Sequence, residues 1–287
     1  MPFAFCPPPE NFGDWLVAPY VEQRGVPSRA APRRRWQVAQ FRTGREEMPT
    51  HRLKLLKREE VAEGTMSFYF EKPADFQFKP GQYLDCSLID PPQTDAEGNI
   101  RTFSIASAPA ESDLMVATRM RDTAFKRVLK GMPLGSHLNI DGPLGSFTMH
   151  SNVSRAAVFL AGGIGITPFR SMIVNATRER LAHRLVLLYS NRRPEDAAFL
   201  EELKKVGSQN RNCRVICVMT AIKKSKRLWD GETGYIDKAM LARSVHDVEA
   251  PIYYVAGPPM MVTATKDVLT GAGVNEDDIR AEDFGGY

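Results

Sequence analysis

The stretch AAVFLAGGIGITPFRSM, residues 156–172, decides the fold that we expect for this chain. Its apolar start, residues 156–161, is too short for a helix that must also turn, so it predicts a buried parallel strand. Glycines follow at Gly162, Gly163 and Gly165. Because a glycine has no Cβ, the backbone can turn tightly there and approach a ligand closely.

The residues after this turn are expected to begin a helix. Thr167 offers a side-chain cap to free backbone N–H groups, and Pro168 is expected at the first helical position, where its missing N–H costs nothing. Together the strand, the turn and the helix start direct a positive helix end at an anion. We therefore expect a nucleotide pyrophosphate at this place; simple packing of strand against helix is the alternative.

Length and charge describe a protein of about two domains. The chain has 287 residues, 25% of them charged, and a formal net charge of +4. This charge is too diffuse to indicate a nucleic-acid partner. No run approaches the ~18 apolar residues of a membrane span. The first residues also lack the pattern of a secretory signal, so we expect a cytoplasmic protein.

The cysteines and histidines predict no metal site. Cys6, Cys86, Cys213 and Cys217 form neither a CxxC pair nor an iron–sulfur spacing. The five histidines form no HxxxH pattern. We expect buried thiols in a reducing compartment.

Residues 1–47 differ from the rest of the chain. They hold seven of its 20 prolines and show no periodicity, a composition that favours a disordered extension. The cluster Arg33-Arg34-Arg35-Trp36 offers contacts to an acidic partner or a membrane surface, but a solvated tail is the better interpretation.

Residues 48–152 carry short strands separated by turns. Met66, Phe68 and Phe70 alternate along one of these strands, as in a sheet with one buried face. Such spacing predicts an antiparallel β-barrel. The expected strands are 65–70, 82–89, 100–107, 114–120 and 137–140, with a short helix at 123–129.

Residues 153–287 change to an alternation of strands and helices, which is typical of an α/β doubly wound parallel sheet. The expected strands are 156–161, 184–190, 214–220, 252–256 and 279–282. The expected helices are 167–181, 194–206, 237–245 and 259–271.

Several motifs, in this order, resemble those of the ferredoxin–NADP reductase superfamily. Residues 101–104, Arg-Thr-Phe-Ser, are similar to its flavin motif, Arg-x-Tyr-Ser/Thr, and residues 80–83 and 142–147 match further landmarks. Residues 162–168 resemble its pyridine-nucleotide loop, and residues 257–260 its nicotinamide-side turn. The resemblance covers residues 50–287 and implies that the barrel binds FAD and the parallel sheet binds NAD(P).

The resemblance assigns roles to the flavin motif. Arg101 would pair with the flavin diphosphate, Phe103 would lie against the isoalloxazine ring, and Ser104 would hydrogen-bond the flavin N5 that accepts hydride. Thr102 and Ile105 belong to the same candidate site. Phe103 departs from the family's tyrosine and loses a hydroxyl group.

Further along the barrel, Arg119, Arg121 and a helix start at Thr123-Ala124 could hold the rest of the diphosphate. Plain surface charge is the alternative for these residues.

Two further segments concern the coenzyme. The turn Gly257-Pro258-Pro259-Met260 follows Ala256, where family members commonly carry a cysteine near the reacting nicotinamide carbon. After the second strand of the parallel sheet no acidic residue is present to bind a ribose 2′-hydroxyl, and Ser190, Arg192 and Arg193 could instead hold the 2′-phosphate of NADP(H). NAD(H) remains an alternative.

The chain ends in aromatic residues, as many family members do. Phe284 fits a Glu-x-Phe ending with Glu282, and Tyr287 fits a C-terminal tyrosine; the resemblance implies that one of these rings stacks on the flavin. We expect it to be Phe284, because Gly285-Gly286 would leave Tyr287 mobile.

These observations predict a reductase that takes hydride from NAD(P)H onto FAD. It would then pass single electrons to a separate carrier, since the sequence holds no iron–sulfur segment. Ferredoxin or flavodoxin is the first expectation for that carrier, an oxygenase component the second, and a monomer the expected state. The alternatives are a nucleotide-binding electron-relay subunit of a larger complex, which Ala256 favours, and a free-flavin reductase.

Overall fold

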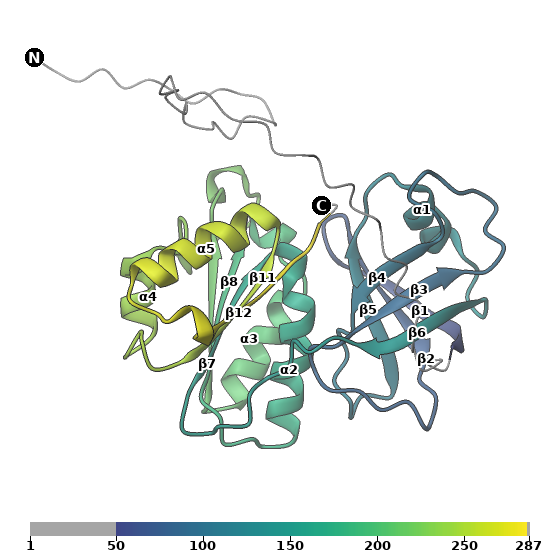
Figure 1. Cartoon of the computed structure of the whole chain (residues 1–287). Helices are drawn as coiled ribbons and strands as arrows, with labels where there is room; N and C mark the ends of the chain where they lie inside the picture. Colours follow the sequence, from purple (N-terminus) through teal and green to yellow (C-terminus); the bar gives the residue numbers. More distant parts are fainter. Residues whose placement is uncertain (1–49, 286–287) are drawn as a thin grey trace, which may run out of the picture. The chain divides into compact units, whose positions relative to one another are not determined.

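The computed structural model describes residues 50–285, so the extension 1–47 and Tyr287, both discussed above, lie outside the described residues. The described residues belong to one unit, which carries two sheets (Figure 1). The first sheet uses residues 51–144 and the second residues 157–283. The domain boundary expected at residues 152 and 153 falls in the segment that connects them.

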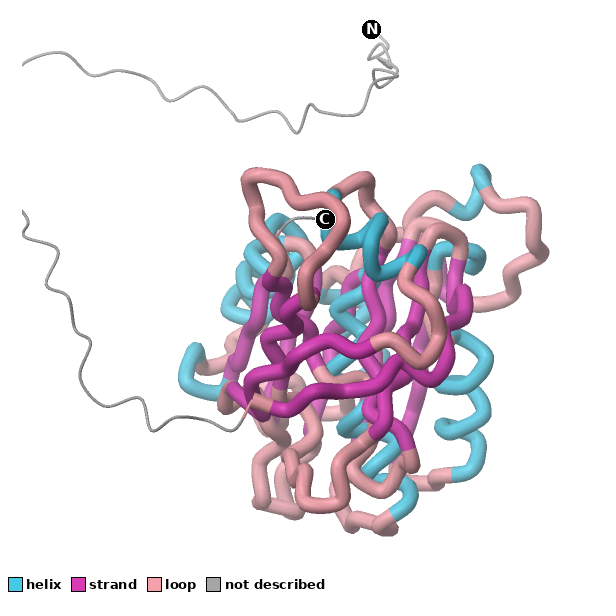
Figure 2. Tube along the Cα trace, turned by 90° about the vertical axis from the view of Figure 1, so that its right-hand side faces the viewer, coloured by secondary structure: helices cyan, strands magenta, loops and turns pink. Residues whose placement is uncertain are grey.

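The first sheet has six strands in the order β4-β3-β6-β1-β2-β5, and every neighbouring pair is antiparallel. Figure 2 turns this sheet toward the viewer and shows its strands in magenta. Its elements are β1 (His51–Ala62), β2 (Thr65–Glu71), β3 (Tyr83–Leu88), β4 (Ile100–Ser104), β5 (Asp113–Arg119), α1 (Ala124–Gly131) and β6 (His137–Leu144).

This sheet curls around a core supplied by alternate residues of its strands. In β3 the side chains of Leu84, Cys86 and Leu88 are buried, and those between them are half-buried. The two edges of the sheet meet just beyond β4, where the backbone N–H of Ala106 donates to the carbonyl of Met115 in β5 at 2.8 Å. The antiparallel barrel expected from the sequence is therefore confirmed.

The second sheet has six strands in the order β10-β9-β8-β7-β11-β12, all parallel. Its strands are β7 (Ala157–Gly162), β8 (Leu185–Asn191), β9 (Cys213–Met219), β10 (Glu232–Thr233), β11 (Ile252–Gly257) and β12 (Ile279–Asp283). Its helices are α2 (Ile166–Arg178), α3 (Leu200–Gln209), α4 (Lys238–Ser244) and α5 (Pro259–Gly271).

The apolar run that opened the sequence analysis is β7, and it is buried on both faces. Phe159 packs in the cluster that holds α2 and α3, whereas Leu160 packs in the cluster that holds α4 and α5. Helices therefore cover both faces of the sheet, so the doubly wound fold expected from the sequence is confirmed.

The start of α2 differs from the expectation. A short 3₁₀ turn at Gly163–Gly165 leads into the helix, which begins at Ile166 with no side-chain cap. The Thr167 hydroxyl donates to the carbonyl of Ile164 at 3.0 Å, so it caps no backbone N–H, and Pro168 occupies the third helical position. A proline is tolerated there because the first four N–H groups of a helix have no partner within it.

The helix expected at 194–206 was also wrong as a single element. Pro194–Asp196 form one 3₁₀ turn, and α3 begins only at Leu200. Between them Ala197 is extended and Phe199 adopts a φ of 59°, and neither conformation belongs to a continuous helix.

The barrel and the parallel sheet share one apolar cluster. The ring centroid of Phe147, just past the barrel, lies 5.8 Å from that of Phe169 in α2 and 5.7 Å from that of Tyr254 in β11. Barrel residues Ala106, Met115 and Ala117 belong to the same cluster. Because this core crosses the boundary between the two sheets, it holds them against each other.

Candidate functional site

A pocket of about 400 Å³ opens where the barrel meets the carboxyl ends of the parallel strands. It gathers segments that are far apart in the sequence: β3 and β4 of the barrel, the start of α2, and the C-terminal segment. A pocket at such a junction is where α/β proteins bind nucleotides. Its lining residues are Tyr83, Thr102, Phe103, Ser104, Ala117, Thr167, Ala281, Glu282, Asp283, Phe284 and Gly285.

The glycine turn lies at the point where the strand order reverses. β7 has β8 on one side and β11 on the other, so the turns after β7 and β11 are neighbours. A Cβ on Gly165 would come within 2.2 Å of the Ala256 carbonyl oxygen, and one on Gly257 within 3.1 Å of the Gly162 backbone. Only glycines allow the two turns to lie this close, which explains their place in both motifs.

Gly163 has a different reason to be glycine. Its φ is 53°, and no heavy atom lies within 4 Å of the place a Cβ would take. The backbone conformation, rather than crowding, favours glycine here. The turn is therefore open on that side, as close approach of a ligand to its backbone requires.

The nicotinamide-side turn leads directly into α5. Pro258 precedes the helix and Pro259 is its first residue, where a proline costs no hydrogen bond. Met260 is 60% exposed.

On the barrel side, Ser104 and Thr102 line the pocket. Ser104 is paired with Tyr83 of β3, and the Thr102 hydroxyl donates to the Asp85 carboxylate at 2.5 Å. Tyr83 rests on Gly145, since a Cβ there would lie 2.7 Å from the tyrosine ring. Tyr83 of the landmark segment 80–83 thus lines the pocket, and Gly145 of segment 142–147 packs against its ring.

The other side of β4 faces the barrel interior, and this affects two predictions. The ring of Phe103 is only 5% exposed and lies 5.9 Å from the ring of Phe125 in α1. Phe103 therefore belongs to the barrel core as well as to the pocket wall, and most of its ring is not available to a flavin. Ile105 is completely buried in the same core, so its contribution to the site is structural.

The predicted diphosphate site contains the expected donors, and carboxylates of this chain occupy them. Thr123 caps α1, and the backbone N–H of Ala124 donates to the Asp95 carboxylate at 2.7 Å. The Arg101 guanidinium pairs with the Glu97 carboxylate at 2.6 Å and lies 3.7 Å from that of Asp95. The donors at this place suit an anion, which the diphosphate of FAD would be.

A buried lysine adds positive charge at the same helix. Lys126 in α1 is 6% exposed, and its ammonium donates to the Arg119 carbonyl at 2.8 Å. Burial, together with the nearby charges of Arg121 and Arg101, lowers the pKa of Lys126 to about 8. Burial is the larger cause of this shift, and the two arginines add to it as positive charges near the start of α1. The Arg119 guanidinium itself is half-exposed and lies 3.9 Å from the Asp196 carboxylate.

The C-terminal segment enters the pocket by joining the parallel sheet as its edge strand, β12. Glu282 is paired with Ala256 of β11, and beyond the strand the N–H of Phe284 donates to the Gly257 carbonyl at 2.9 Å. Phe284 also packs on the shared apolar cluster. Burial raises the pKa of Glu282 to about 7, so this carboxyl titrates near neutral pH.

At the end of β8, the residues predicted to hold a 2′-phosphate have different surroundings. The Arg193 guanidinium donates to the Asp196 carboxylate at 2.7 and 2.9 Å and to that of Glu63 at 3.0 Å. These carboxylates pair with Arg193 in the structure, and the 2′-phosphate contact predicted for it stays a prediction. Ser190 is half-buried at the end of the strand, and Arg192 follows it.

Sequence reasoning assigned no role to Tyr83, Asp95, Lys126 or Arg170. Tyr83 stands inside a landmark motif that carried no role by itself. The others gave no usable signal, because an acidic residue in a loop and a basic residue in a helix are ordinary features of a solvated surface.

Two family models match the chain and divide it as the structure does. Residues 52–149 match the oxidoreductase FAD-binding domain, and residues 159–267 match the oxidoreductase NAD-binding domain. The chain belongs to the ferredoxin–NADP reductase superfamily. Like other members of this superfamily, it carries an FAD-binding domain followed by an NAD-binding domain of an oxidoreductase.

Relatives within the superfamily are components of reductases. The chain is 30% identical to the glycine betaine monooxygenase reductase subunit of Chromohalobacter salexigens, over 77% of this chain and 60% of that one. It is 27% identical to a component of the Na⁺-translocating NADH-quinone reductase of Methylococcus capsulatus, over 65% of this chain and 49% of that one. The chain thus spans 60% or less of the length of these relatives.

A solved structure shows the same fold. The ferredoxin NADP⁺ reductase of Neisseria gonorrhoeae, with bound FAD and NADP, superimposes with a TM-score of 0.67 at 21% identity. The match covers 82% of this chain and 98% of that one.

None of the helices in residues 50–285 is long and apolar enough to cross a membrane.

Proposed function

We propose that this chain is an FAD-containing reductase that oxidises NAD(P)H and passes the electrons to a separate carrier protein. The observation that carries the proposal is the pocket in which Ser104 of the flavin motif, Thr167 of the coenzyme helix and the tail residues Glu282 and Phe284 meet. When bound, FAD supplies the redox chemistry, taking two electrons as hydride and releasing them singly.

In this proposal the chain binds and orients two cofactors. Arg101 and the Ala124 N–H at the start of α1 would hold the flavin diphosphate in place of the Glu97 and Asp95 carboxylates that they contact in this structure, beside the helix cap Thr123. Ser104, which lines the pocket, would donate a hydrogen bond to the flavin. The glycine turn Gly162–Gly165 and the start of α5 hold the coenzyme at the switch point of the parallel sheet.

The tail is proposed to cover the flavin. Phe284 lines the pocket beside Ser104 and would exclude water from it until the nicotinamide displaces the ring. Glu282, with its raised pKa, holds a proton within the pocket near neutral pH.

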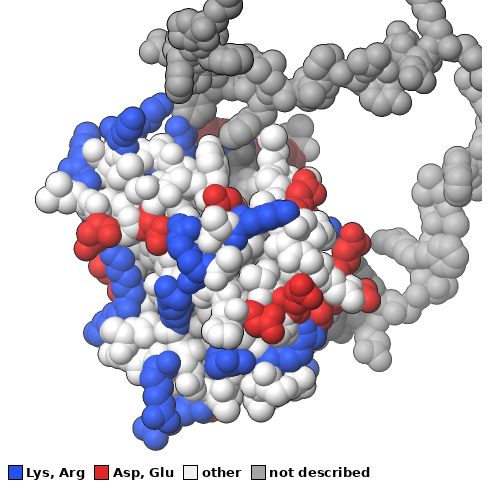
Figure 3. All heavy atoms as spheres, turned by 90° about the vertical axis from the view of Figure 1, so that its left-hand side faces the viewer, with Lys and Arg blue, Asp and Glu red and all other residues white. Residues whose placement is uncertain are grey.

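For the acceptor, an oxygenase component is favoured, because a relative at 30% identity is named as the reductase subunit of a monooxygenase. Ferredoxin and flavodoxin are the other candidates. A nucleic-acid partner is disfavoured by the face shown in Figure 3, where Lys and Arg side chains are mixed with Asp and Glu and form no single-sign patch.

The second candidate function is an electron-relay subunit of a larger complex. Two observations favour it: Ala256 at the carboxyl end of β11, and the likeness to one component of an NADH-quinone reductase. The chain would then bind both nucleotides but turn over only within its complex.

NADP(H) is our proposed coenzyme, with NAD(H) as the alternative, and a cytoplasmic monomer is the proposed state. The cysteines in the described residues, Cys86, Cys213 and Cys217, are all buried and form no disulfide, which suits a reducing compartment.

A single purification tests the proposal. The full chain should bind FAD, and stopped-flow mixing with NADPH or NADH should bleach the flavin absorbance. Turnover with a one-electron acceptor dye should follow. A protein that binds FAD but is not reduced by either coenzyme would favour the relay role, and a protein that binds no flavin would refute the proposal.

A further inference from the structure

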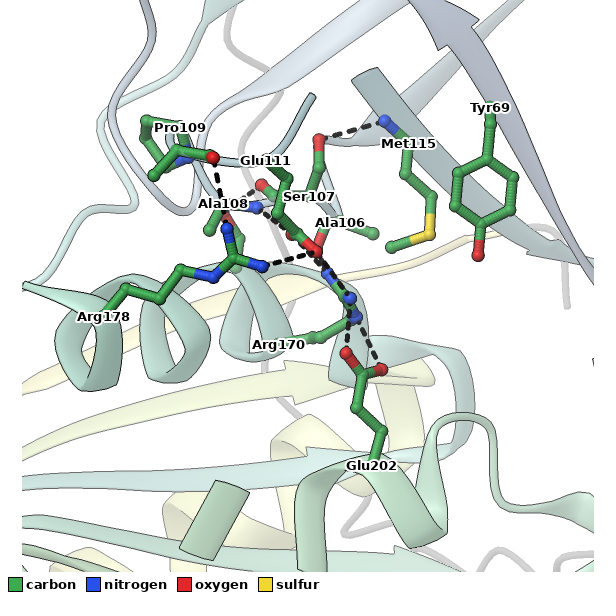
Figure 4. Close-up of polar contacts among 12 residues, drawn as sticks. Tyr69, Ala106, Ser107, Ala108, Pro109, Glu111, Met115, Arg170, Arg178 and Glu202 are labelled. Atoms are coloured by element: carbon green, nitrogen blue, oxygen red, sulfur yellow. Dashed lines mark hydrogen bonds and ion pairs between the residues drawn. The ribbon is translucent and has the colours of Figure 1, made fainter. Parts of the chain in front are cut away.

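Helix α2 carries a buried arginine that joins the two halves of the pocket. Arg170 is 5% exposed, and its contacts lie among segments that are distant in the sequence (Figure 4). Its Nη1 donates to the Ala106 carbonyl at 2.8 Å and to the Glu111 carboxylate at 2.9 Å. Its Nη2 donates to Glu111 at 3.1 Å and to the Glu202 carboxylate at 2.5 Å, and its Nε to Glu202 at 2.9 Å.

These five hydrogen bonds match the five N–H donors of a guanidinium group. Burial works against the charge, but the bonds to the Glu111 and Glu202 carboxylates outweigh it and raise the pKa of Arg170. The guanidinium also lies 5.2 Å from the Phe199 ring, which closes the site on one side. A lysine, with three donors on a flexible stem, cannot reproduce this set of contacts.

The segments joined by Arg170 are the ones that carry the two cofactor motifs. Ala106 stands two residues after Ser104 of the flavin motif, and Arg170 stands three residues after Thr167 of the coenzyme turn. The neighbouring Ser171 adds a bond of the same kind, from its hydroxyl to the Ser107 carbonyl at 2.7 Å. Two consecutive residues of α2, Arg170 and Ser171, thus hydrogen-bond to the backbone that follows β4.

We propose that Arg170 is a positioning residue that sets the distance between the flavin motif on β4 and the coenzyme turn at the start of α2. Arg170 does not line the pocket, so it acts through Ala106, Glu111 and Glu202 rather than on either cofactor. The inference rests on the proposed function, since it concerns the alignment of flavin and nicotinamide. A displacement of about 1 Å between reacting groups can reduce a rate about 100-fold.

The chain offers a matched control. Arg178 lies two turns further along α2 and contacts the loop between β4 and β5, to which Ala106 and Glu111 belong. Its contacts are the Ala110 carbonyl at 3.1 Å and Glu111 at 3.9 Å. It is half-exposed, however, and it shares Glu111 with Arg170 only at the longer distance of 3.9 Å. Its backbone contact is with the Ala110 carbonyl and not with the Ala106 carbonyl that Arg170 holds. Arg178→Gln therefore removes a similar charge from the same helix without releasing Ala106.

The experiment compares Arg170→Gln, Arg170→Lys and Arg178→Gln in the full chain. We expect flavin reduction at saturating coenzyme to be about 10- to 100-fold slower in both Arg170 variants, while the Kd values for FAD and coenzyme change less than about 3-fold. In the flavin-free proteins, amide hydrogen exchange of residues 105–107, which Arg178 does not contact, should rise in Arg170→Gln only. Arg170→Lys should recover much of the lost Tm but not the rate, because it restores charge without the planar fork.

Several results would overturn the inference. If the flavin of an Arg170 variant is reduced at the wild-type rate, whatever the Tm of that variant, the role of Arg170 is merely structural. The same conclusion follows if Arg178→Gln slows flavin reduction as much as the Arg170 variants do. If Arg170→Gln does not fold, Glu202→Gln takes its place, with Glu201→Gln as control because Glu201 pairs instead with exposed Arg227. A failure of the proposed function would be seen separately, because the wild-type protein itself would then bind no FAD or would not be reduced.

Discussion

The backbone N–H of Phe284 donates to the carbonyl of Gly257 at 2.9 Å. Gly257 ends β11 and begins the turn predicted to hold the nicotinamide, so the pocket-lining aromatic residue and the coenzyme turn are joined by one backbone bond. The bond holds the main chain of Phe284 in place and does not involve its ring. Displacement of the ring therefore does not require the tail to leave the sheet.

The first prediction concerns Phe284→Ala. If the ring covers the flavin, part of the coenzyme binding energy goes into moving it, so the truncation should tighten coenzyme binding. It should also reduce discrimination between NADPH and NADH, because an uncovered flavin accepts either nicotinamide. The measurement is kcat/KM and Kd for both coenzymes, with Tyr287→Ala as the companion variant. A shift in Tyr287→Ala and none in Phe284→Ala would assign stacking to the terminal tyrosine.

A second prediction separates flavin binding from flavin reduction. Arg101→Ala should weaken FAD binding by about 1.5–3 kcal/mol, because a charge-assisted contact is lost. Ser104→Ala should retain FAD and slow its reduction. Flavin content and stopped-flow reduction report the two effects. Glu97→Gln serves as the opposite test: it removes the carboxylate that pairs with Arg101, so FAD binding should tighten. Unchanged FAD affinity in Arg101→Ala would remove that residue from the site.

The raised pKa of Glu282 predicts a pH dependence. Below pH 7 the carboxyl is neutral, and above it a negative charge enters the pocket and opposes the arrival of electrons. Flavin reduction should therefore slow as the pH rises through about 7. Glu282→Gln should lose this inflection and be the faster protein at pH about 8. An inflection that persists in Glu282→Gln would assign the titration to another group.

The same residue predicts a stability effect with a definite sign. Because the folded-state pKa of about 7 lies above the ordinary value of 4.5, the carboxyl costs no stability below pH 4.5, and its cost grows as the pH rises to 7. The Tm of Glu282→Gln relative to wild type should therefore increase between pH about 4.5 and pH about 8.

A fourth prediction distinguishes the two arginines after β8. Arg192→Ala should weaken NADPH binding about 10- to 100-fold and leave NADH nearly unchanged, if Arg192 contacts the 2′-phosphate. Arg193→Ala should instead lower the Tm with little effect on coenzyme choice, because Arg193 is held by Asp196 and Glu63. Ratios of kcat/KM for the two coenzymes, measured beside thermal unfolding, separate the effects. NADPH kinetics unchanged in both variants would favour NAD(H).

Patterns along the chain were enough to determine the two folds and their order. Period-two patterns such as that of Phe68 and Phe70 predict strands with one buried face, and a short apolar run such as β7 predicts a strand buried on both faces. The glycine at Gly165 indicated a close approach of the backbone, because a Cβ there would collide with the backbone of Ala256 and Gly257. These features are local, so the order of residues was sufficient to predict them.

Which charged groups meet was decided by the tertiary structure alone. Arg193 and Arg101 were both predicted to contact a phosphate, yet Glu63 reaches Arg193 from the barrel, and Asp95 and Glu97 reach Arg101 from a loop. Arg170 looked like an ordinary helix residue until α2 brought it against Ala106 and Glu111. Ion pairs and burial depend on distances between segments remote in the chain, and a pattern along the chain carries no such distances.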